Sequence, residues 1–499
     1  LTMPSTIMIS SSQFPLVESS YSRLPNQFYR PANPTPVERP SVVLWNAQLA
    51  GELGLDKIED PSRLAALLSG NQTSAGLHPL AMAYAGHQFG HFVPQLGDGR
   101  AILLGEAVGR DGVRHEIQLK GAGPTPFSRN GDGRSSLGPV IREYLASEAM
   151  HALGIATTRA LAATTTGEKV FREMALPGAV LARVARSHIR IGTFQYFAAR
   201  RDLAAVRALA DHVIGNFFPA VAEDGQRYRA FFLAVRDAQA ALLARWMQVG
   251  FIHGVMNTDN MSILGDTIDY GPCAFMDAYD PATVYSAIDQ MGRYAYANQP
   301  NIAAWNLARL GETLLDLIDP DQGKAITWVE EAVQAFVPAY DANWLRGMKA
   351  KIGLLADLPE DQSLVEQLLD AMHKGKADYT LTFRRLAATV DGGADPAVTS
   401  LFTEPGIVEQ WLRRWRERLS LENRPADIAR DMQRINPAFI LRNHRIEQAI
   451  DAAVEEGDFS KAIELHTLLA KPFDDQPEFA GYLEPPRPGD WKCKTFCGT

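Results

Sequence analysis

The spacing of apolar residues divides the chain into a first part with strand periodicity and a second part with helix periodicity. Residues 101–108 and the alternating stretch at 115–120, HEIQLK, flank a Gly-containing turn, which predicts a β-hairpin. The segment Val140–Leu153 has apolar residues at helical spacing and ends at Gly154, so we predict a helix there. Residues 157–185 return to strand-like sequence.

From residue 201 onward the apolar pattern follows the helical period almost without interruption. Long amphipathic helices are predicted at Asp202–Val221 and Tyr228–Val249. Further helical blocks are predicted near residues 281–293, 300–318, 324–335, 343–356, 361–374, 405–419, 437–454 and 459–469. The last two hundred residues are therefore expected to be almost entirely α-helical.

The region before the hairpin gives a weaker pattern. Residues 1–42 are rich in Ser, Pro and Asn, which predicts an extended arm outside the core. Two short helical patterns follow, at Leu44–Leu53 and Pro61–Leu68. His87 and His91 stand four residues apart and would share a face of a helix, as a metal site requires. No Glu follows the first His, and Gly90 weakens a helix, so a structural loop is the favoured interpretation.

Composition narrows the class of protein. The chain has 499 residues, of which 46% are hydrophobic and 21% charged, as in globular proteins of two to four units. Its net charge of -9 argues against a broad surface for binding nucleic acid or membranes. The sequence contains no run of 18 apolar residues, so no membrane-spanning helix is expected. Three cysteines do not form a disulfide scaffold, so a reducing cytosol is expected.

The stretch Phe251–Asp269 carries the clearest candidate chemistry. Asn260 follows His253 by seven residues, and Asp269 begins an Asp-Tyr-Gly turn. An amide oxygen and a carboxylate in this arrangement are suited to hold Mg²⁺ on a nucleoside triphosphate.

Other parts of a nucleotide site precede this stretch. A Gly-Asp-Gly-Arg turn at residues 97–100 opens the predicted hairpin, Lys120 closes it, and Glu143 lies one turn into the following helix. A Gly-x-Gly turn alone is a weak signal, and a single Glu is usually solvated. A basic segment then contains Arg183, Arg186, His188 and Arg190, which is either a solvated surface or a set of forked donors for phosphate.

The order of these parts is that of a protein kinase, and the spacing of His253 and Asn260 matches its catalytic loop. One position departs from the pattern, because Val255 stands where kinases carry the catalytic Asp. An Asp appears instead at 259, directly before Asn260.

Several longer stretches extend the likeness: AYAGHQFG, GDGRA, QLKGAGPTPFSR, DGRSSLG, HGVMNTDNMSI, IDYGPCAFMD, and a cysteine third from the C-terminus. With them the chain resembles the selenoprotein O family over nearly its whole length. The resemblance implies an α+β, protein kinase-like two-lobed fold with an N-terminal extension and a large, mostly helical C-terminal region. It also implies a pseudokinase that transfers AMP from ATP to Ser, Thr or Tyr hydroxyls of proteins, with the nucleotide bound in reverse.

The resemblance assigns roles residue by residue. Asp259 is expected to be the catalytic base, and Asn260 and Asp269 to hold Mg²⁺ or Mn²⁺. Arg183 and Arg190 are expected to hold the terminal phosphate. The expected nucleotide-binding set is Gly97, Gly99, Arg100, Lys120, Asp132, Gly133, Glu143, Arg183, Arg190 and Asp269.

The family also suggests a redox link between the C-terminal tail and the catalytic domain. A Cys273–Cys497 disulfide is one hypothesis, and an inert, buried Cys273 is the alternative.

The expected units are an extension at 1–95, an N-lobe at 96–185, a C-lobe with the catalytic loop at 186–330, a helical region at 331–474 and a Pro-rich tail at 475–499. We expect a monomer in the bacterial cytoplasm, or in mitochondria for a eukaryotic member, with ATP and protein substrates as its partners. Two alternatives stay open: a kinase that moves the γ-phosphate, against which Val255 argues, and a nucleotide-binding scaffold without catalysis, against which the full set of site residues argues.

Overall fold

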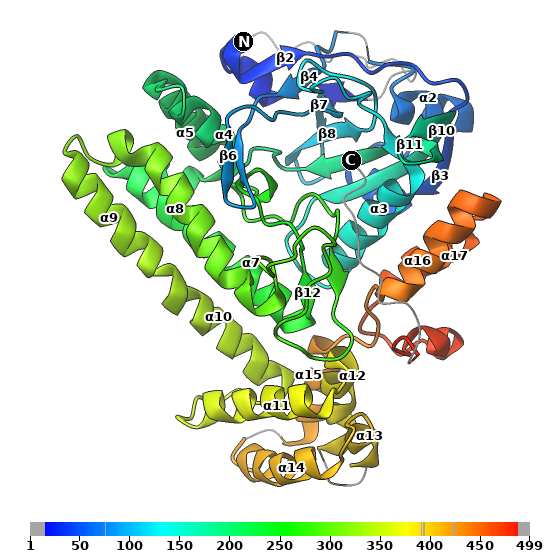
Figure 1. The fold of residues 1–499 in the computed structure, drawn as a ribbon, viewed down its shortest axis with the longest axis vertical. Helices are drawn as coiled ribbons and strands as arrows, with labels where there is room; N and C mark the ends of the chain where they lie inside the picture. The colour runs from blue at the N-terminus through cyan, green and yellow to red at the C-terminus, as the bar shows by residue number, and fades with distance from the viewer. Residues whose placement is uncertain (1–14, 75, 391, 393–394, 423–424, 488–499) are drawn as a thin grey trace, which may run out of the picture.

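The computed structural model of the protein describes residues 15–487, apart from residues 75, 391, 393–394 and 423–424. It combines helices and sheet, with a large antiparallel sheet at one end and helices α11–α15 at the other (Figure 1). Long helices run between these two ends, so the chain forms an elongated molecule.

The sheet contains nine strands in the order β2-β4-β7-β8-β11-β10-β3, with β1 paired to β7 and β9 paired to β11. Neighbouring strands that hydrogen-bond do so in antiparallel fashion. The strands are β1 (Leu16–Val17), β2 (Tyr29–Pro31), β3 (Ser41–Trp45), β4 (Leu80–Met82), β7 (Ala101–Val108), β8 (Arg114–Lys120), β9 (Ser135–Ser136), β10 (Arg159–Phe171) and β11 (Ala175–Ala185).

The predicted extended arm is wrong for the part of residues 1–42 that the structure describes. Strands β1 and β2 belong to the sheet, and the side chains of Tyr21 and Phe28 are fully buried. Phe28 packs on Phe197 with ring centroids 4.1 Å apart. Prolines suit short edge strands, whose outward N–H groups need no ladder partner, so a Pro-rich segment is compatible with the sheet edge.

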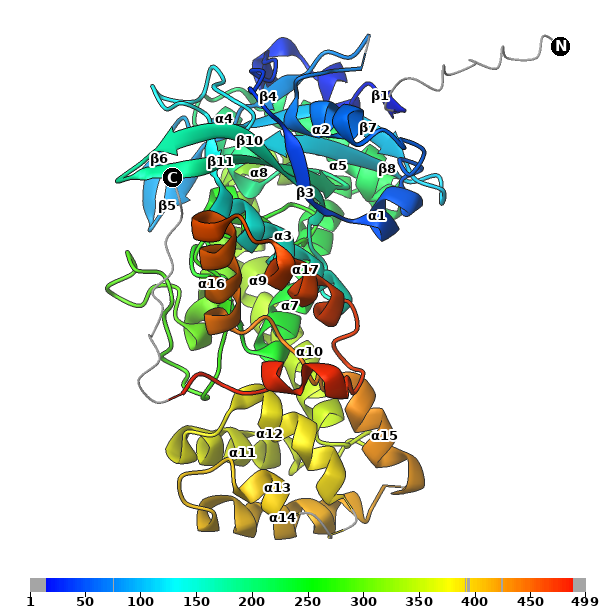
Figure 2. The same cartoon turned by 90° about the vertical axis from the view of Figure 1, so that its right-hand side faces the viewer.

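The predicted hairpin and helix are both present, as β7–β8 and α3. Strand β8 buries the middle of its sequence against β7 and β11, and its last residue, Lys120, pairs with Ala101 and Leu181. Helix α3 (Leu137–Ala152) packs on β10 and β11. Helices α16 (Asn443–Asp451) and α17 (Ser460–Leu469) cover its outer side, so α3 is buried nearly all round (Figure 2).

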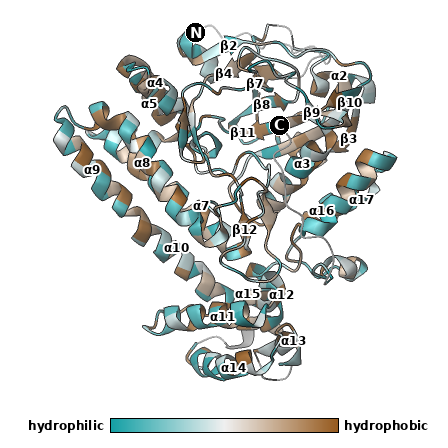
Figure 3. Cartoon of the chain, in the orientation of Figure 1, coloured by the Kyte–Doolittle hydropathy of each residue, from teal (hydrophilic) through white to brown (hydrophobic). Residues whose placement is uncertain are grey.

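Two hydrophobic clusters organise the rest of the chain. The larger one joins the sheet to helices α4, α5, α7, α8, α9, α16 and α17, and the smaller one lies among α10–α15. Helix α10 enters both, with Phe336 in the first cluster and Met348 in the second. The peripheral helices alternate hydrophilic and hydrophobic residues, as one-sided packing requires (Figure 3).

The helices not yet bounded follow in chain order. They are α1 (Ala47–Glu52), α2 (Pro61–Ser69), α4 (Ile191–Ala198), α5 (Leu203–Phe217), α6 (Pro219–Ala222), α7 (Arg227–Val249), α8 (Gln299–Ile318), α9 (Gln322–Gln334), α10 (Phe336–Lys351), α11 (Asp361–Gly375), α12 (Tyr379–Leu386), α13 (Pro396–Thr399), α14 (Gly406–Leu419) and α15 (Pro425–Ile435).

Several helix predictions need correction. Residues 281–293 form turns, because the carboxylate of Asp289 accepts the backbone N–H groups of Arg293 and Tyr294 and closes a loop. The pattern at Leu44–Leu53 is the end of β3 followed by the short α1, and the block near 437–454 is helical only from Asn443. Helices α4, α12, α13 and α15 were not predicted.

Within the part of the chain that the structure describes, no helix is both long enough and apolar enough to cross a membrane.

Replacement of Phe28 by Ala tests whether the N-terminal segment belongs to the core. We expect Phe28→Ala to lower the free energy of unfolding by about 3–5 kcal/mol, because a fully buried aromatic ring is lost. The matched control is Phe171→Ala, whose side chain is 75% exposed, with an expected change within about 0.5 kcal/mol. Equal effects in urea denaturation would contradict the burial of this segment.

Candidate active site

Three cationic side chains converge on the carboxylate of Asp269. Lys120 Nζ lies 2.6 Å from Oδ1, and Arg183 Nη2 lies 2.5 Å from the same oxygen. Arg190 Nη1 lies 2.6 Å from Oδ2. The guanidinium groups are almost completely buried, with side-chain exposures of 1% for Arg183 and 4% for Arg190.

Glu143 supplies the second carboxylate of this cluster. Its Oε2 lies 2.6 Å from Lys120 Nζ, so the expected ion pair between strand and helix forms. Its Oε1 accepts a hydrogen bond from Arg183 Nε at 2.9 Å. Three cations thus face two carboxylates, and the cluster of these five residues keeps a net charge of +1. We call these five residues the cation cluster.

Mutual attraction keeps the carboxylates and guanidinium groups of the cation cluster charged. Burial raises the pKa of Asp269, but Arg183, Lys120 and Arg190 outweigh burial and hold it well below its usual range. The same balance lowers the pKa of Glu143. Burial alone would lower the pKa of Arg183. The attraction of Asp269 and Glu143 is stronger, so the pKa is raised overall. A buried charge is tolerated only when it is paired in this way.

The residues of the cation cluster come from five separate segments. Alternation along β8 places Gln118 and Lys120 on one face, where Gln118 Oε1 accepts a hydrogen bond from Arg183 Nη1 on β11 at 3.3 Å. Arg190 is the N-cap residue of α4. Asp269 has a φ of 65°, a left-handed conformation that Asp adopts more easily than most residues.

His253 fixes the segment that presents Asp269. Its Nε2 donates a hydrogen bond to the carbonyl of Ile268 at 2.9 Å, and its ring stacks on Trp246. Burial lowers the pKa of His253, so the ring is neutral and its tautomer is set by this hydrogen bond. The His of the sequence motif is therefore a structural support for Asp269.

Asp259 lies beside the cation cluster on a short 3₁₀ turn, Thr258–Asn260. Arg190 Nη1 donates to its carbonyl oxygen at 2.7 Å. The carboxylate is buried, its Oδ2 accepts a long 3.4 Å hydrogen bond from Gln88, and its Oδ1 has no hydrogen-bond partner among the described residues. Burial raises the pKa of Asp259 to about 6, although Arg190 opposes the shift. A carboxylate of this kind is a competent general base near neutral pH.

Two glycines allow this close packing. A Cβ on Gly86 would lie 2.3 Å from Asp259 Oδ1, and a Cβ on Gly192 would lie 2.1 Å from the carbonyl oxygen of Ala85. A side chain at Gly86 would displace the carboxylate of Asp259, and one at Gly192 would displace the backbone of Ala85.

Asn260 and Asp269 are the candidate metal ligands. Asn260 Nδ2 donates to the carbonyl of Val255 at 3.0 Å, which fixes the amide. Among the described residues no group of three or more His, Cys, Asp and Glu side chains is placed to hold a metal ion. A pair of hard oxygen donors still suits Mg²⁺, which keeps several waters and is completed by phosphate oxygens. The donor set therefore fits a nucleotide-bound divalent cation.

The predicted glycine loops pack against one another. Gly97 has a φ of 71°, and a Cβ there would overlap the ring of Phe127. Gly133 has a φ of 65°, and a Cβ there would meet the backbone of Gly123 at 2.1 Å. Gly99 contacts the same loop at Phe127, and the half-buried Arg100 follows it at the start of β7.

Asp132 does not join the cation cluster. Its carboxylate pairs with Arg172 at 2.8 Å on the β10–β11 hairpin, and it accepts the backbone N–H of Arg134. Hydrogen bonds from Arg172 lower the pKa of Asp132. In this structure Asp132 therefore holds the loop in place, and its predicted contact with nucleotide stays a prediction.

The two histidines of the early motif lie on a hairpin. Strand β5 (Gly86–Gln88) pairs with β6 (His91–Val93), so His87 faces Phe92, and His91 is exposed opposite Gln88. The His87 Nδ1 atom lies 2.8 Å from Gln195 Nε2. His87 and His91 therefore lie on two paired strands and not on one face of a helix, which agrees with the structural interpretation of this motif.

The redox hypothesis concerns Cys273 and Cys497. Cys273 is buried, with 3% of its surface exposed. Cys497 lies outside the described residues, so their pairing stays a prediction.

Sequence reasoning missed several residues around the site. Arg190 stacks over the ring of Tyr84 at 4.7 Å and lies 3.9 Å from the buried Asp98, whose Oδ2 also accepts from Gln118. Gln88 contacts Asp259 from a position 171 residues earlier. The motif stretches contain Tyr84, Gln88, Asp98 and Gln118, but no periodicity marks them as neighbours of the site.

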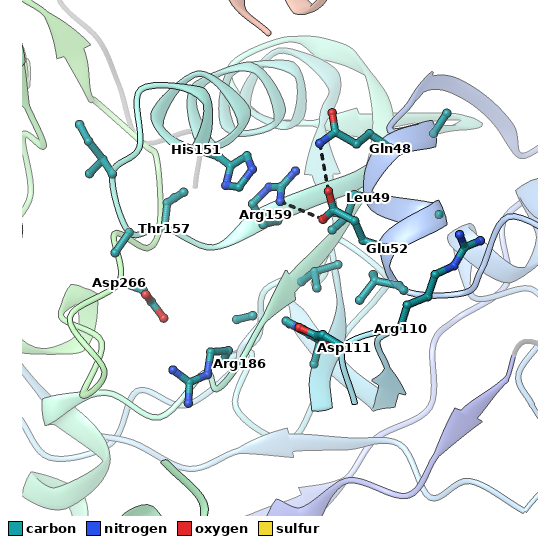
Figure 4. Close-up of a pocket in the computed structure, with 18 residues that line it drawn as sticks. Gln48, Leu49, Glu52, Arg110, Asp111, His151, Thr157, Arg159, Arg186 and Asp266 are labelled. Carbon is teal, nitrogen blue, oxygen red and sulfur yellow. Dashed lines mark hydrogen bonds and ion pairs between the residues drawn. The ribbon is translucent and has the colours of Figure 1, made fainter. Parts of the chain in front are cut away.

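A separate cavity of about 750 Å³ lies away from the cation cluster, between α1, the end of α3 and the end of β11 (Figure 4). Arg159 crosses one wall and pairs with Glu52, while Arg186 and Asp266 lie on another. None of the five residues of the cation cluster lines this cavity, so we do not assign the nucleotide to it.

Comparison with known proteins gives a consistent set of relatives. The family described as "Protein adenylyltransferase SelO" matches residues 15–470. The protein nucleotidyltransferase YdiU of Rhizobium rhizogenes is 60% identical over 486 residues, which cover 97% of this chain and 96% of the relative. The YdiU proteins of Rhizobium meliloti and Bradyrhizobium sp. are 58% and 56% identical to this chain, each over 484 residues. The matches cover 97% of this chain and 99% of each relative.

The buried, raised pKa of Asp259 predicts that its negative charge costs stability. The pKa is about 6 in the folded chain and about 3.9 when unfolded, so the cost is absent below pH 4 and complete above pH 6. We expect Asp259→Asn to raise the free energy of unfolding by about 2–3 kcal/mol at pH 8, with the gain shrinking as the pH falls toward 4.

Urea denaturation of both proteins at several pH values measures this gain. The control is Asp341→Asn, an exposed change on α10 with an expected effect within about 0.5 kcal/mol. A gain that does not vary with pH would contradict the buried charge.

Proposed function

This chain belongs to the protein adenylyltransferase SelO family, and we propose that its cation cluster holds the triphosphate of ATP while Asp259 activates the acceptor. The protein is a nucleotidyltransferase that transfers AMP from ATP to hydroxyl groups of proteins and releases pyrophosphate. The observation that carries the site assignment is the convergence of Lys120, Arg183 and Arg190 directly beside a base whose pKa is about 6.

We further propose a protein kinase-like arrangement of two lobes around this site. The N-lobe comprises the sheet strands and α3 of residues 96–185, and the C-lobe residues 186–330 with the catalytic loop. Residues 1–95 extend the sheet, residues 331–474 form the helical region, and a tail begins at 475. The strand–helix ion pair of Lys120 and Glu143 and the Asp-Tyr-Gly turn at 269–271 support this arrangement.

The nucleotide enters with its γ-phosphate innermost. Arg183 and Arg190 are the most deeply buried cations of the cluster, and two buried guanidinium groups favour the end of the ligand with the most negative charge. A γ-phosphate held there leaves the α-phosphate nearer to Asp259 and the adenosine toward the outside. This orientation is the reverse of the one in protein kinases.

Asn260 and Asp269 would hold a divalent cation, Mg²⁺ or Mn²⁺, on the phosphates. When bound, such an ion neutralises phosphate charge and stabilises the departing pyrophosphate. The rest of the charge compensation comes from the chain itself, through Lys120, Arg183 and Arg190.

The chemical step is an in-line displacement at the α-phosphorus. The acceptor hydroxyl gives its proton to the free Oδ1 of Asp259 while its oxygen forms a bond to the α-phosphorus. The bond between the α-phosphorus and the bridging oxygen breaks, and that oxygen leaves with pyrophosphate. Val255 occupies the position of the usual kinase base, and its aliphatic side chain cannot accept a proton.

The partners follow from the reaction. ATP is the co-substrate, and acceptors are proteins that present Ser, Thr or Tyr. We propose that the enzyme acts as a monomer in the bacterial cytoplasm.

Labelled ATP tests the direction of transfer. We expect label at the α-phosphorus, and none at the γ-phosphorus, to appear on acceptor proteins of a cell extract. Asp259→Ala and Asp269→Ala should each reduce transfer by at least about a hundredfold, since they remove the base and the partner of three cations. The exposed Asp341→Ala is the control and should keep full activity. Transfer from the γ-position would establish a kinase instead.

The pH dependence of AMP transfer reports on Asp259. The base must be ionised, so kcat/KM should be level above pH 6 and fall about tenfold per pH unit below it. A profile that stays level down to pH 4 would exclude Asp259, with its raised pKa, as the base.

A further inference from the structure

The free oxygen of Asp259 lies next to a loop and a hairpin that form one connected surface. His87 donates its backbone N–H to Thr258, and Phe89 donates its own to Asn257 at 3.0 Å. The hydroxyl of Tyr294 donates to the same Asn257 oxygen at 2.7 Å. The β5–β6 hairpin and the loop at residues 280–298 are thereby fastened to the segment that carries the base.

This surface contains a cluster of cations around Trp305. Arg293 and Arg309 lie over its indole ring, 4.9 and 5.0 Å from the centroid, and His87 meets it edge-on. The guanidinium of Arg293 also lies against Gly90 at the turn of the hairpin. Arg293 packs on the rings of both Tyr294 and Trp305, and Arg309 packs on Trp305, so both side chains are held in place.

The positive charge of Arg293 is not balanced by a carboxylate. Arg309 pairs with Glu312 at 2.7 Å, but Arg293 makes no ion pair among the residues that the structure describes. Asp289, the nearest acid in the loop, accepts the backbone N–H groups of Arg293 and Tyr294 and is itself buried. The Nε atom of Arg293 is buried, and no described residue forms a hydrogen bond with it.

Large apolar side chains are exposed on the same two segments. Phe92 on the hairpin is 40% exposed, and Ile288 and Met291 on the loop are 60% and 93% exposed. We call the hairpin, the loop at 280–298 and Trp305 the acceptor face. Exposed apolar residues beside fixed arginines are typical of surfaces that bind protein segments.

We propose that the acceptor protein docks on the acceptor face and that Arg293 selects segments with an acidic residue close to the modified hydroxyl. This inference rests on the proposed function, because an acceptor hydroxyl has to reach Asp259 Oδ1. A carboxylate on Arg293 complements its unbalanced charge, while the apolar side chains contact the rest of the segment. A basic flanking residue would meet two guanidinium groups and be repelled.

The transfer step itself is unchanged by this recognition. The acceptor O–H proton moves to Asp259, the new bond joins the acceptor oxygen to the α-phosphorus, and pyrophosphate leaves. Arg293 contacts the flanking carboxylate and does not touch the reacting atoms. It acts as a specificity-determining residue.

Matched peptides test the proposal. Each carries one Ser, Thr or Tyr flanked by Glu, by Gln or by Lys, and kcat/KM is measured with ATP labelled at the α-phosphorus. For the unchanged enzyme we expect about a fivefold preference for Glu over Gln, as an exposed ion pair provides. Arg293→Gln should abolish this preference yet leave transfer to the Gln peptide unchanged, and Arg293→Glu should favour the Lys peptide.

Two further variants keep the result unambiguous. Arg293→Lys retains the charge and should retain most of the preference, and the exposed Arg346→Gln on α10 should behave as the unchanged enzyme. A preference for Glu that survives Arg293→Gln would overturn the proposal, as would equal use of all three peptides by the unchanged enzyme. If the unchanged enzyme transferred no α-label to peptides or to extract proteins, the proposed reaction would fail, and this inference with it.

Discussion

The cation cluster is the interaction on which the rest of this structure depends. Two guanidinium groups with side-chain exposures of only 1% and 4% are held in the protein interior by the carboxylates of Asp269 and Glu143. Removing one partner of such a buried set leaves an uncompensated charge and costs several kcal/mol, about 3–5 in measured cases. Because the five members come from β8, α3, β11, the start of α4 and the 269 turn, their pairing also fixes these elements relative to one another.

The same cluster explains the environment of Asp259. Arg190 binds the carbonyl of Asp259 and the carboxylate of Asp269, so Asp259 and the cation cluster share one side chain. Burial of Asp259 raises its pKa to about 6, and Gly86 and Gly192 leave just enough room for it. A carboxylate left without a full set of hydrogen bonds is unfavourable for folding but suitable for taking a proton.

The sequence predicted the parts of the site that have a local signal. Alternation in HEIQLK placed Lys120 at the end of a strand, and helical spacing placed Glu143 on the helix that the structure shows as α3. The choice of Asp259 as the base came from the family resemblance, since spacing alone marked only that Val255 replaces the kinase Asp. Gln88 and Tyr84 contact Asp259 and Arg190 across long sequence separations, which no local pattern encodes.

The errors in the fold have similar causes. Prolines in residues 1–42 suggested an arm, yet Tyr21 and Phe28 bury their rings at the sheet edge through tertiary packing. Helix α4 was missed because nearly all its residues are buried, so its sequence has no polar face to reveal the period. Residues 281–293 have helical spacing, but Asp289 binds the backbone of the loop and competes with a helix.

The most direct test of the account is an experimental structure with Mg²⁺ and a non-hydrolysable ATP analogue. We expect the γ-phosphate between Arg183 and Arg190, and the α-phosphate within reach of Asp259 Oδ1. An adenine ring in the place of the γ-phosphate, with the triphosphate directed outward as in kinases, would contradict it.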